Sequence, residues 1–186
     1  RVVATARLER SSLMLFQGRA DAARQELDRA GDDELWQRVS TLRLPANDLD
    51  FRGLALARWQ ILAGDPEDAL PDLERMQQEA NAEHRFRRAL KLKLLKTMAL
   101  HRCTRIREAL ELMKDVIQMA ASEGYQRLII DEGPSAGMLA MLHLQTLKDA
   151  GHDAADPILI GYLHTLVDAF GPEVRESGVA SGDNEE

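Results

Sequence analysis

The sequence GDPEDALPDL, residues 64–73, is the stretch that decides the fold. Gly64 suits the position just after a helix, because glycine adopts the left-handed backbone that ends many helices. Asp65 can cap the next helix with its carboxylate, and Pro66 fits the first turn of that helix. The stretch therefore predicts a tight turn between two helices.

The residues on both sides of this turn predict four helices, arranged as two consecutive pairs. The first pair is expected over residues 48–63 and 66–81, and the second over residues 83–102 and 106–122. Apolar residues recur at helical spacing in the last of the four, at Ile106, Ala109, Leu110, Met113, Val116, Ile117 and Ala120. Residues 48–63 are apolar almost all round, so other helices should cover that helix on more than one side.

The same short pattern follows three turns of the chain. A small residue lies five positions after the turn residue and a large apolar residue nine positions after it, as in Gly18, Ala23, Leu27; Gly64, Ala69, Leu73; and Thr104, Ala109, Met113. The small residue lets one helix approach its neighbour closely, and the apolar residue four positions later stays on that face. Self-similarity at this period predicts a stacked helical repeat, with an ordinary helical bundle as the alternative.

Helices are also expected in the flanking regions, over residues 2–17, 20–30, 135–150 and 157–170. A brief helix should follow Gly31, and residues 44–48 break the pattern. Residues 1–171 form one predicted domain, and the polar tail over residues 172–186 is expected to be disordered.

Composition narrows the class of protein. Of the 186 residues 45% are hydrophobic but only 4% aromatic, which favours a helical core of Leu, Ala, Met and Ile over a sandwich or barrel. The formal net charge of −7 argues against direct binding of nucleic acid by this segment. No apolar run is long enough for a membrane span.

One cysteine, Cys103, excludes an internal disulfide and indicates a cytoplasmic protein. At a helix end without an acid–base partner, this thiol is read as a passive, half-buried residue. Because the chain begins at Arg1 without a signal peptide, we expect it to be a fragment of a larger protein.

No pattern of catalytic or metal-binding residues is present. The sequence lacks a phosphate-binding loop, a dinucleotide fingerprint and any His or Cys pair at metal-ligand spacing, and it predicts neither an enzyme nor a cofactor. Asp131 and Glu132 are neighbours, and adjacent side chains point in different directions, so capping is their expected role rather than catalysis.

Basic residues gather on the helix expected over residues 83–102. They are Arg85, Arg87, Arg88, Lys91, Lys93 and Lys96, along with the apolar residues Phe86, Leu90, Leu94, Leu95 and Met98. A solvated face that balances nearby acids is one interpretation, and a surface for an anionic ligand or a partner is the other.

One string resembles a known family. Residues 123–134, EGYQRLIIDEGP, followed by Met138 and Leu139, are similar to the C-terminal part of the sensor region in MalT-like, LuxR-type transcriptional activators. Those proteins usually carry Glu-Gly-Tyr-x-Arg, two or three apolar residues and Asp-Glu-Gly there. Upstream, Leu56-Ala57-Arg58, Gly64-Asp65 and Asp68-Ala69-Leu70 resemble the tetratricopeptide-like (TPR-like) repeats of that family, and the likeness extends over most of residues 50–170.

The resemblance implies a right-handed TPR-like superhelix of stacked antiparallel helix pairs. It also implies a regulatory sensor that binds an inducer or partner protein and controls self-association, with an ATP-binding domain before this segment and a DNA-binding helix-turn-helix after it. In TPR-like stacks the first helix of each pair lines the concave groove. The residues that would face the groove are then Arg58 and Ile61 in one pair, and Lys91, Leu94, Met98 and His101 in the next. A plain scaffold that binds a protein partner and no small molecule is the alternative, and self-association through exposed ends of the stack is a third possibility.

Overall fold

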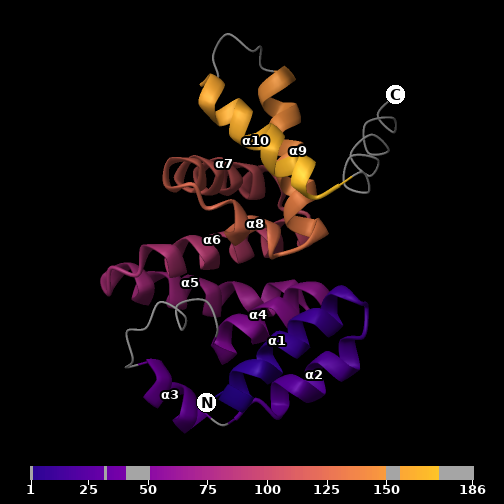
Figure 1. Ribbon diagram of the computed structural model, residues 1–186, viewed down its shortest axis with the longest axis vertical. Helices are drawn as coiled ribbons and strands as arrows, with labels where there is room; N and C mark the ends of the chain where they lie inside the picture. The colour runs from indigo at the N-terminus through magenta and orange to yellow at the C-terminus, as the bar shows by residue number, and fades with distance from the viewer. Residues whose placement is uncertain (1, 32, 41–50, 150–155, 172–186) are drawn as a thin grey trace. The chain divides into compact units, whose positions relative to one another are not determined.

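The computed structural model describes residues 2–31, 33–40, 51–149 and 156–171, and these are helical apart from turns, with no strand among them. The helices are α1 Val2–Phe16, α2 Ala20–Asp28, α3 Asp33–Ser40, α4 Arg52–Ala63, α5 Pro66–Ala82, α6 Phe86–Arg102, α7 Ile106–Glu123, α8 Gln126–Ile130, α9 Pro134–Asp149 and α10 Pro157–Ala169 (Figure 1). The predicted break at residues 44–48 and the predicted disordered tail lie outside the described residues. The fold is all-α, as the sequence predicts.

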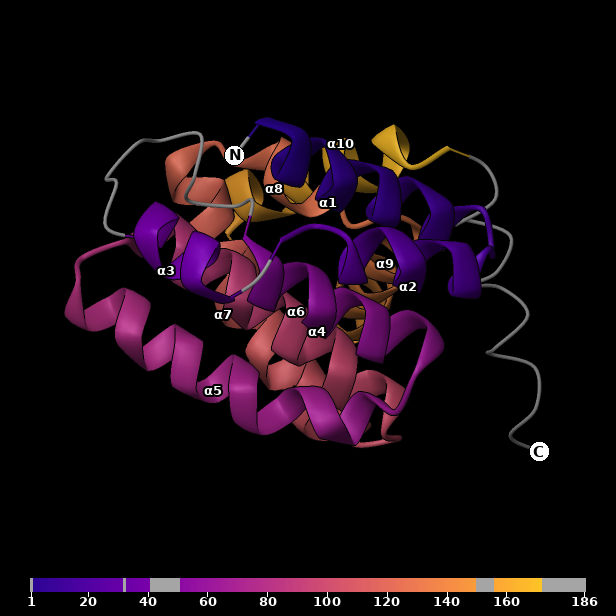
Figure 2. The same cartoon turned by 90° about the horizontal axis from the view of Figure 1, so that it is seen from below.

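The chain divides into two compact units, residues 1–104 and residues 105–186, which are described separately. In the first unit α1 packs against α2, and α5 packs against both α4 and α6. Figure 2 shows α4 between the α1–α2 pair on one side and α5 on the other. Neighbouring antiparallel helices that share one core are the expected stacked arrangement.

Helix α4 is the centre of the first unit. It contacts α1, α2, α5 and α6, and its residues Leu54 and Ile61 are fully buried. The indole nitrogen of Trp59 donates a hydrogen bond of 3.2 Å to the carbonyl oxygen of Ala20, which ties α4 to the start of α2. The apolar character of α4 on every side is therefore explained by its neighbours, as predicted.

The turn between α4 and α5 has the predicted aspartate cap and first-turn proline, but not the predicted glycine backbone. The Asp65 carboxylate accepts a hydrogen bond of 2.9 Å from the backbone nitrogen of Glu67, and Pro66 is the first residue of α5. Gly64 itself has a φ of −105°, so this turn does not use the left-handed backbone that a glycine would permit. The aspartate cap and the proline thus define the turn.

A different turn recurs at residues 84, 104 and 124, twenty residues apart, and also at residue 18. Each has one residue with a left-handed φ between 57° and 71°, followed by a residue near φ −90° and ψ 60° that begins the next helix. Glycine occupies two of these positions, whereas His84 and Thr104 occupy the others. The repeat is therefore a property of the backbone and does not require glycine at every turn.

The small and large residues that follow the turns are buried as the repeat predicts. All six have at most 1% of their surface exposed: Ala23, Leu27, Ala69, Leu73, Ala109 and Met113. Their burial confirms that the pattern in the sequence marks the packed face of each second helix.

The second unit is built around α9, which packs against α7, α8 and α10. A Cβ atom placed at Gly137 would lie 2.7 Å from the Phe170 ring, so glycine allows this ring to lie directly on α9. The Asp156 carboxylate accepts a hydrogen bond of 2.9 Å from the backbone nitrogen of Ile158, and Pro157 opens α10. Both features of this helix start are those expected from the sequence.

Candidate functional site

The six residues predicted to line a groove lie on two helices of the first unit that pack against each other, α4 and α6. Ile61, Leu94 and Met98 are at most 1% exposed, and Lys91 is 2% exposed. Arg58 and His101 are half-buried. A ligand that approaches these helices would therefore meet Arg58 and His101 first, with the other four residues behind the surface.

The two half-buried residues differ in charge at neutral pH. Burial, and secondarily the neighbouring charge of Arg102, lowers the pKa of His101, so its imidazole is neutral and can both donate and accept a hydrogen bond. Arg58 keeps its guanidinium charged, as arginine does in proteins. The pair offers one permanent cation and one neutral polar group.

Helix α6 is held in position against α5 by charged side chains. The Lys96 ammonium pairs with the Glu74 carboxylate on α5, and Gln78 also donates to Glu74 at 3.0 Å. The hydrogen bond from Lys96, and next that from Gln78, lower the pKa of Glu74. The Lys96–Glu74 pair thus joins α6 to α5, while the Gln78–Glu74 contact lies within α5.

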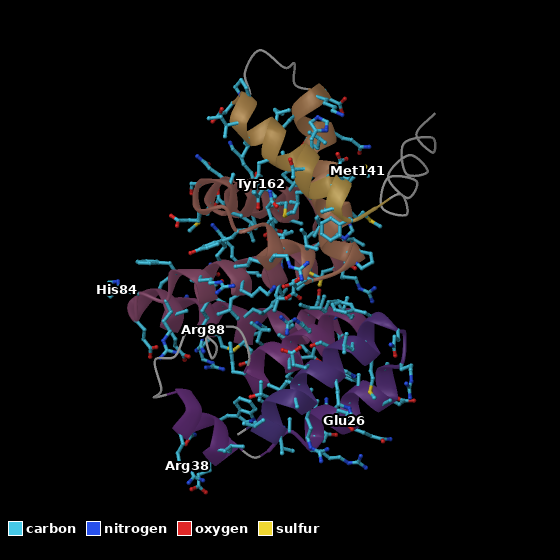
Figure 3. All side chains as sticks on the ribbon, in the orientation of Figure 1. Glu26, Arg38, His84, Arg88, Met141 and Tyr162 are labelled. Atoms are coloured by element: carbon cyan, nitrogen blue, oxygen red, sulfur yellow. The ribbon has the colours of Figure 1, made fainter. Side chains whose placement is uncertain are left out.

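A second surface lies at the turn between α5 and α6. We call residues 84–88, His84-Arg85-Phe86-Arg87-Arg88, the basic–aromatic turn. Phe86 is 62% exposed, and its ring lies 5.9 Å from the ring of His84 at an angle of 59°. Figure 3 shows His84 and Arg88 at the same end of the α5–α6 pair.

Arg85 and Arg88 contact residues on either side of this turn. The Arg85 Nε atom lies 2.8 Å from a carboxylate oxygen of Glu83. The Arg88 guanidinium lies 4.3 Å from the centre of the Phe51 ring, the residue just before α4. Arg87 lies between them in sequence and is exposed. The turn therefore presents an aromatic ring within a group of cations.

The sequence indicated only part of this surface. The basic character of residues 83–102 is visible in the sequence, but no pattern in the sequence assigns His84 or Phe51 to this surface. The twenty-residue spacing of residues 84, 104 and 124 could have identified His84 as a turn residue. The stacking of Arg88 on Phe51 joins segments far apart in sequence and has no local signal.

One buried acid in the first unit is structural. Glu26 is 6% exposed, and its carboxylate lies 3.5 Å from Arg7, 3.7 Å from Arg10 and 4.0 Å from Arg29. Because a buried charge is costly unless it is paired, these arginines explain how Glu26 is tolerated between α1 and α2.

Among the described residues of the second unit, two buried polar atoms lack a hydrogen-bond partner, His143 Nε2 on α9 and Tyr162 Oη on α10. Burial raises the pKa of Tyr162 to about 12. Burial, and secondarily Lys114 on α7, lowers the pKa of His143. Both side chains are therefore neutral near pH 7 and occupy the α7–α9–α10 region without a charge.

The neighbours Asp131 and Glu132 do not form a carboxylate pair. Asp131 is exposed and lies 3.4 Å from Arg127, one turn earlier, whereas Glu132 is only 1% exposed. Their different surroundings agree with the expectation that adjacent side chains point apart.

Within the ranges that the structure describes, no three His, Cys, Asp or Glu side chains gather as metal ligands. No described helix combines the length and apolar character that crossing a membrane requires.

Comparison with known protein families gives a match over most of the chain. The sequence model for the MalT-like TPR region matches residues 2–146. No curated protein and no solved structure matches the chain. The matched range includes α1 to α8 and most of α9, and with them both surfaces described above.

Proposed function

We propose, from the premise that this chain belongs to the family of MalT-like TPR regions, that it is the regulatory sensor module of a bacterial LuxR-type transcriptional activator. The family match over residues 2–146 is the observation that carries this proposal. Helical repeats of this kind are scaffolds for interaction, and their stacked surfaces bind other molecules without catalysing a reaction.

The binding surface that we propose for an inducer is formed by α4 and α6. Arg58 supplies a fixed positive charge, and His101 supplies a neutral hydrogen-bonding group. Ile61, Leu94 and Met98 provide the rigid apolar support behind them. This combination suits a small ligand that carries an anionic or hydroxyl group, because a few polar groups on an apolar base fix its orientation.

Calorimetry with a panel of anionic metabolites tests this proposal. A true inducer should bind the unchanged chain, and Arg58→Ala and His101→Ala should each weaken binding by about tenfold. Arg75→Ala on α5 is a suitable control, because Arg75 is exposed and pairs with Asp72 and Glu79 along its own helix. Binding that survives both changes at α4 and α6 would locate the ligand elsewhere.

A second candidate function is a scaffold that binds a protein and no small molecule. The exposed Phe86 within a group of arginines favours this alternative, since exposed aromatic and arginine residues are typical of protein interfaces. Thermal unfolding separates the two functions. A metabolite that raises the unfolding temperature supports the sensor, whereas stabilisation by a protein partner alone supports the scaffold.

A further inference from the structure

We propose that the outer face of α1 docks against the same face of a second copy of this chain, so that two copies form a weak dimer about a two-fold axis. We call the six residues of this face the outer stripe of α1: Val3, Ala6, Glu9, Arg10, Leu13 and Phe16. The outer stripe contains none of the residues of α4 and α6 that are proposed to meet an inducer. The inference therefore goes beyond the proposed function, and each can fail without the other.

The outer stripe lies opposite the face that α1 buries. The buried residues of α1 recur at intervals of three or four, at Ala4, Leu8, Ser11 and Leu15. They face α2 and α4, which pack against α1 in the first unit (Figure 2). At about 100° of rotation per residue, the outer stripe falls on the other side of the helix, and all six of its residues are exposed.

Apolar side chains gather on this face. Eight large apolar side chains are exposed among the described residues, and α1 carries four of them, at Val2, Val3, Leu13 and Phe16. Leu13 is 58% exposed and Phe16 is 42% exposed. Single exposed apolar residues are ordinary, but several on one helix face indicate a surface that another molecule covers.

The repeat indicates that a helix is the element that fits this face. Gly18 and Gly64 occupy equivalent turns, so α1 and α4 align at an offset of 46 residues. Leu13 then corresponds to Trp59 of α4, whose indole nitrogen donates a hydrogen bond to Ala20 of the neighbouring helix α2. A position that contacts another helix in α4 thus carries an exposed leucine in α1.

The outer stripe is also complementary to itself. A two-fold axis that crosses α1 between residues 9 and 10 sets the two helices antiparallel and places opposite each other the residues whose numbers add up to 19. Each of the resulting pairs occurs twice, and the pairs are Val3 with Phe16, Ala6 with Leu13, and Glu9 with Arg10. Apolar residues therefore meet apolar residues, a small alanine meets the leucine, and opposite charges meet near the axis. This self-complementarity identifies the occupant as a second copy.

Charge does not oppose the pairing. The whole chain has a formal charge of −7, but α1 carries two arginines and one glutamate, so the faces that meet are not acidic. Arg10 lies 3.7 Å from Glu26 and its side chain is 60% exposed, so it can reach Glu9 of the second copy and keep Glu26 as a neighbour. Salt screens the long-range repulsion between two chains of charge −7. The dimer should therefore become tighter as salt rises.

The size of the face predicts a weak dimer. Helix α1 has 15 residues, which is a length of about 22 Å. A stable interface between proteins buries about 1,600 Å² in total, and one such helix from each copy supplies less. The expected dissociation constant is on the order of 100 μM.

Sedimentation equilibrium of the full 186-residue chain, from about 10 μM to about 1 mM, tests the proposal. A reversible equilibrium between monomer and dimer is expected. Leu13→Glu should weaken the dimer by at least about tenfold, because it places a charge against Ala6 of the second copy. Phe86→Glu on α6 is the matched control and should leave the dimer unchanged, since Phe86 is 62% exposed and lies outside the outer stripe.

A pair of charge changes tests the two-fold arrangement itself. Glu9→Arg and Arg10→Glu should each weaken the dimer by about tenfold, because like charges then meet across the axis. The two changes together should restore it, because opposite charges meet again. Arg7 and Arg29 remain beside Glu26 when Arg10 is replaced, so its carboxylate keeps neighbouring cations.

Several results would overturn the proposal. A chain that stays monomeric over the whole range, a dimer that Leu13→Glu leaves unchanged, or equal weakening by Phe86→Glu would each exclude the outer stripe as the interface. Growth beyond the dimer, or a double charge change that fails to restore association, would exclude the two-fold pairing. Circular dichroism shows whether each variant keeps its helices, and all of the replaced residues are exposed, so the core should stay intact.

Discussion

The turn before α6 and the turn before α7 share one backbone and carry different surfaces. Both place a left-handed residue, His84 or Thr104, before an arginine and an apolar first residue of the next helix. They differ four positions after the left-handed residue, where Arg88 stands in one turn and Glu108 in the other. Glu108 binds Arg105 within its own turn, whereas Arg88 stacks on Phe51. The backbone of the repeat thus sets the fold, and exposed side chains set what each turn can bind.

The difference extends into the helices that follow the two turns. Nine residues after Thr104 lies Met113, which is fully buried, but nine residues after His84 lies Lys93, which is only half-buried. The corresponding position therefore belongs to the core in α7 and to the edge in α6. The predictions below test this comparison, from the largest expected effect to the smallest.

The largest expected effect is at the buried position of α7. Met113→Ala should lower the free energy of unfolding by about 2–5 kcal/mol, because it removes buried apolar atoms and leaves a cavity. Lys93→Ala should change it by less than about 0.5 kcal/mol, as expected for a partly exposed position away from the core. Urea denaturation of both variants measures the difference, and equal losses would contradict the assignment of the two positions.

The next effect concerns the left-handed residues. A β-branched residue at Thr104, with a φ of 60°, is strained, so Thr104→Gly should stabilise the chain by about 1 kcal/mol. His84→Gly should give a smaller gain, since histidine tolerates this backbone better than threonine does.

Gly124→Ala is the reverse change and serves as the control. It should lower the free energy of unfolding by about 1 kcal/mol, because Gly124 has a φ of 70° and no other atom lies within 4 Å of the added methyl group. Thermal unfolding of the three variants measures these shifts. Destabilisation by Thr104→Gly would show that threonine makes a contact worth more than its strain.

A smaller effect is expected from the acid that distinguishes the two turns. Glu108→Gln should cost no more than about 0.5 kcal/mol, because the Arg105–Glu108 pair is about half exposed and solvent screens it. Arg88→Glu would place an acid in the first turn of α6, which favours the helix, but it would remove the stacking on Phe51.

These two contributions are similar in size, so the stability of Arg88→Glu should remain within about 1 kcal/mol of the unchanged chain. Urea denaturation checks both variants. A loss of several kcal/mol on Arg88→Glu would mean that the contact with Phe51 supports the core.

Most of the fold could be predicted from local signals. Asp65-Pro66 and Asp156-Pro157 mark helix starts through side-chain chemistry that depends on a few neighbouring residues, and both were correct. The burial of Ala69 and Ala109 could be predicted because each lies five positions after a turn residue, in a pattern that recurs along the sequence. The expected start of α6 near residue 83 was early by three residues, because His84 and Arg85 form the turn instead of the helix. A histidine gives no clear sign of a left-handed backbone.

The candidate sites were harder to predict for a physical reason. The residues proposed to line a groove lie on two helices that are in contact, but helical spacing does not determine whether a face meets solvent or core. Ile61, Leu94 and Met98 are buried, and only Arg58 and His101 reach the surface. Exposure depends on which helices pack on α6, and that is a property of the tertiary structure. That a groove binds an inducer or a partner protein, and that the helices form a right-handed superhelix, both stay predictions.

The smallest expected effect is a pH dependence near the end of α6. Burial, and secondarily Arg102, lowers the pKa of His101 in the folded chain below its value in the unfolded chain, near 6.5. The unfolded chain therefore binds more protons as the pH falls through 6.5, and stability that His101 contributes at neutral pH is lost toward pH 5. His101→Gln should lose less stability than the unchanged chain over that interval, as measured by urea denaturation at pH 7 and pH 5. Because other titrating groups are common to both proteins, the difference between their two losses isolates His101, and equal losses would mean that the imidazole is solvated in the folded state.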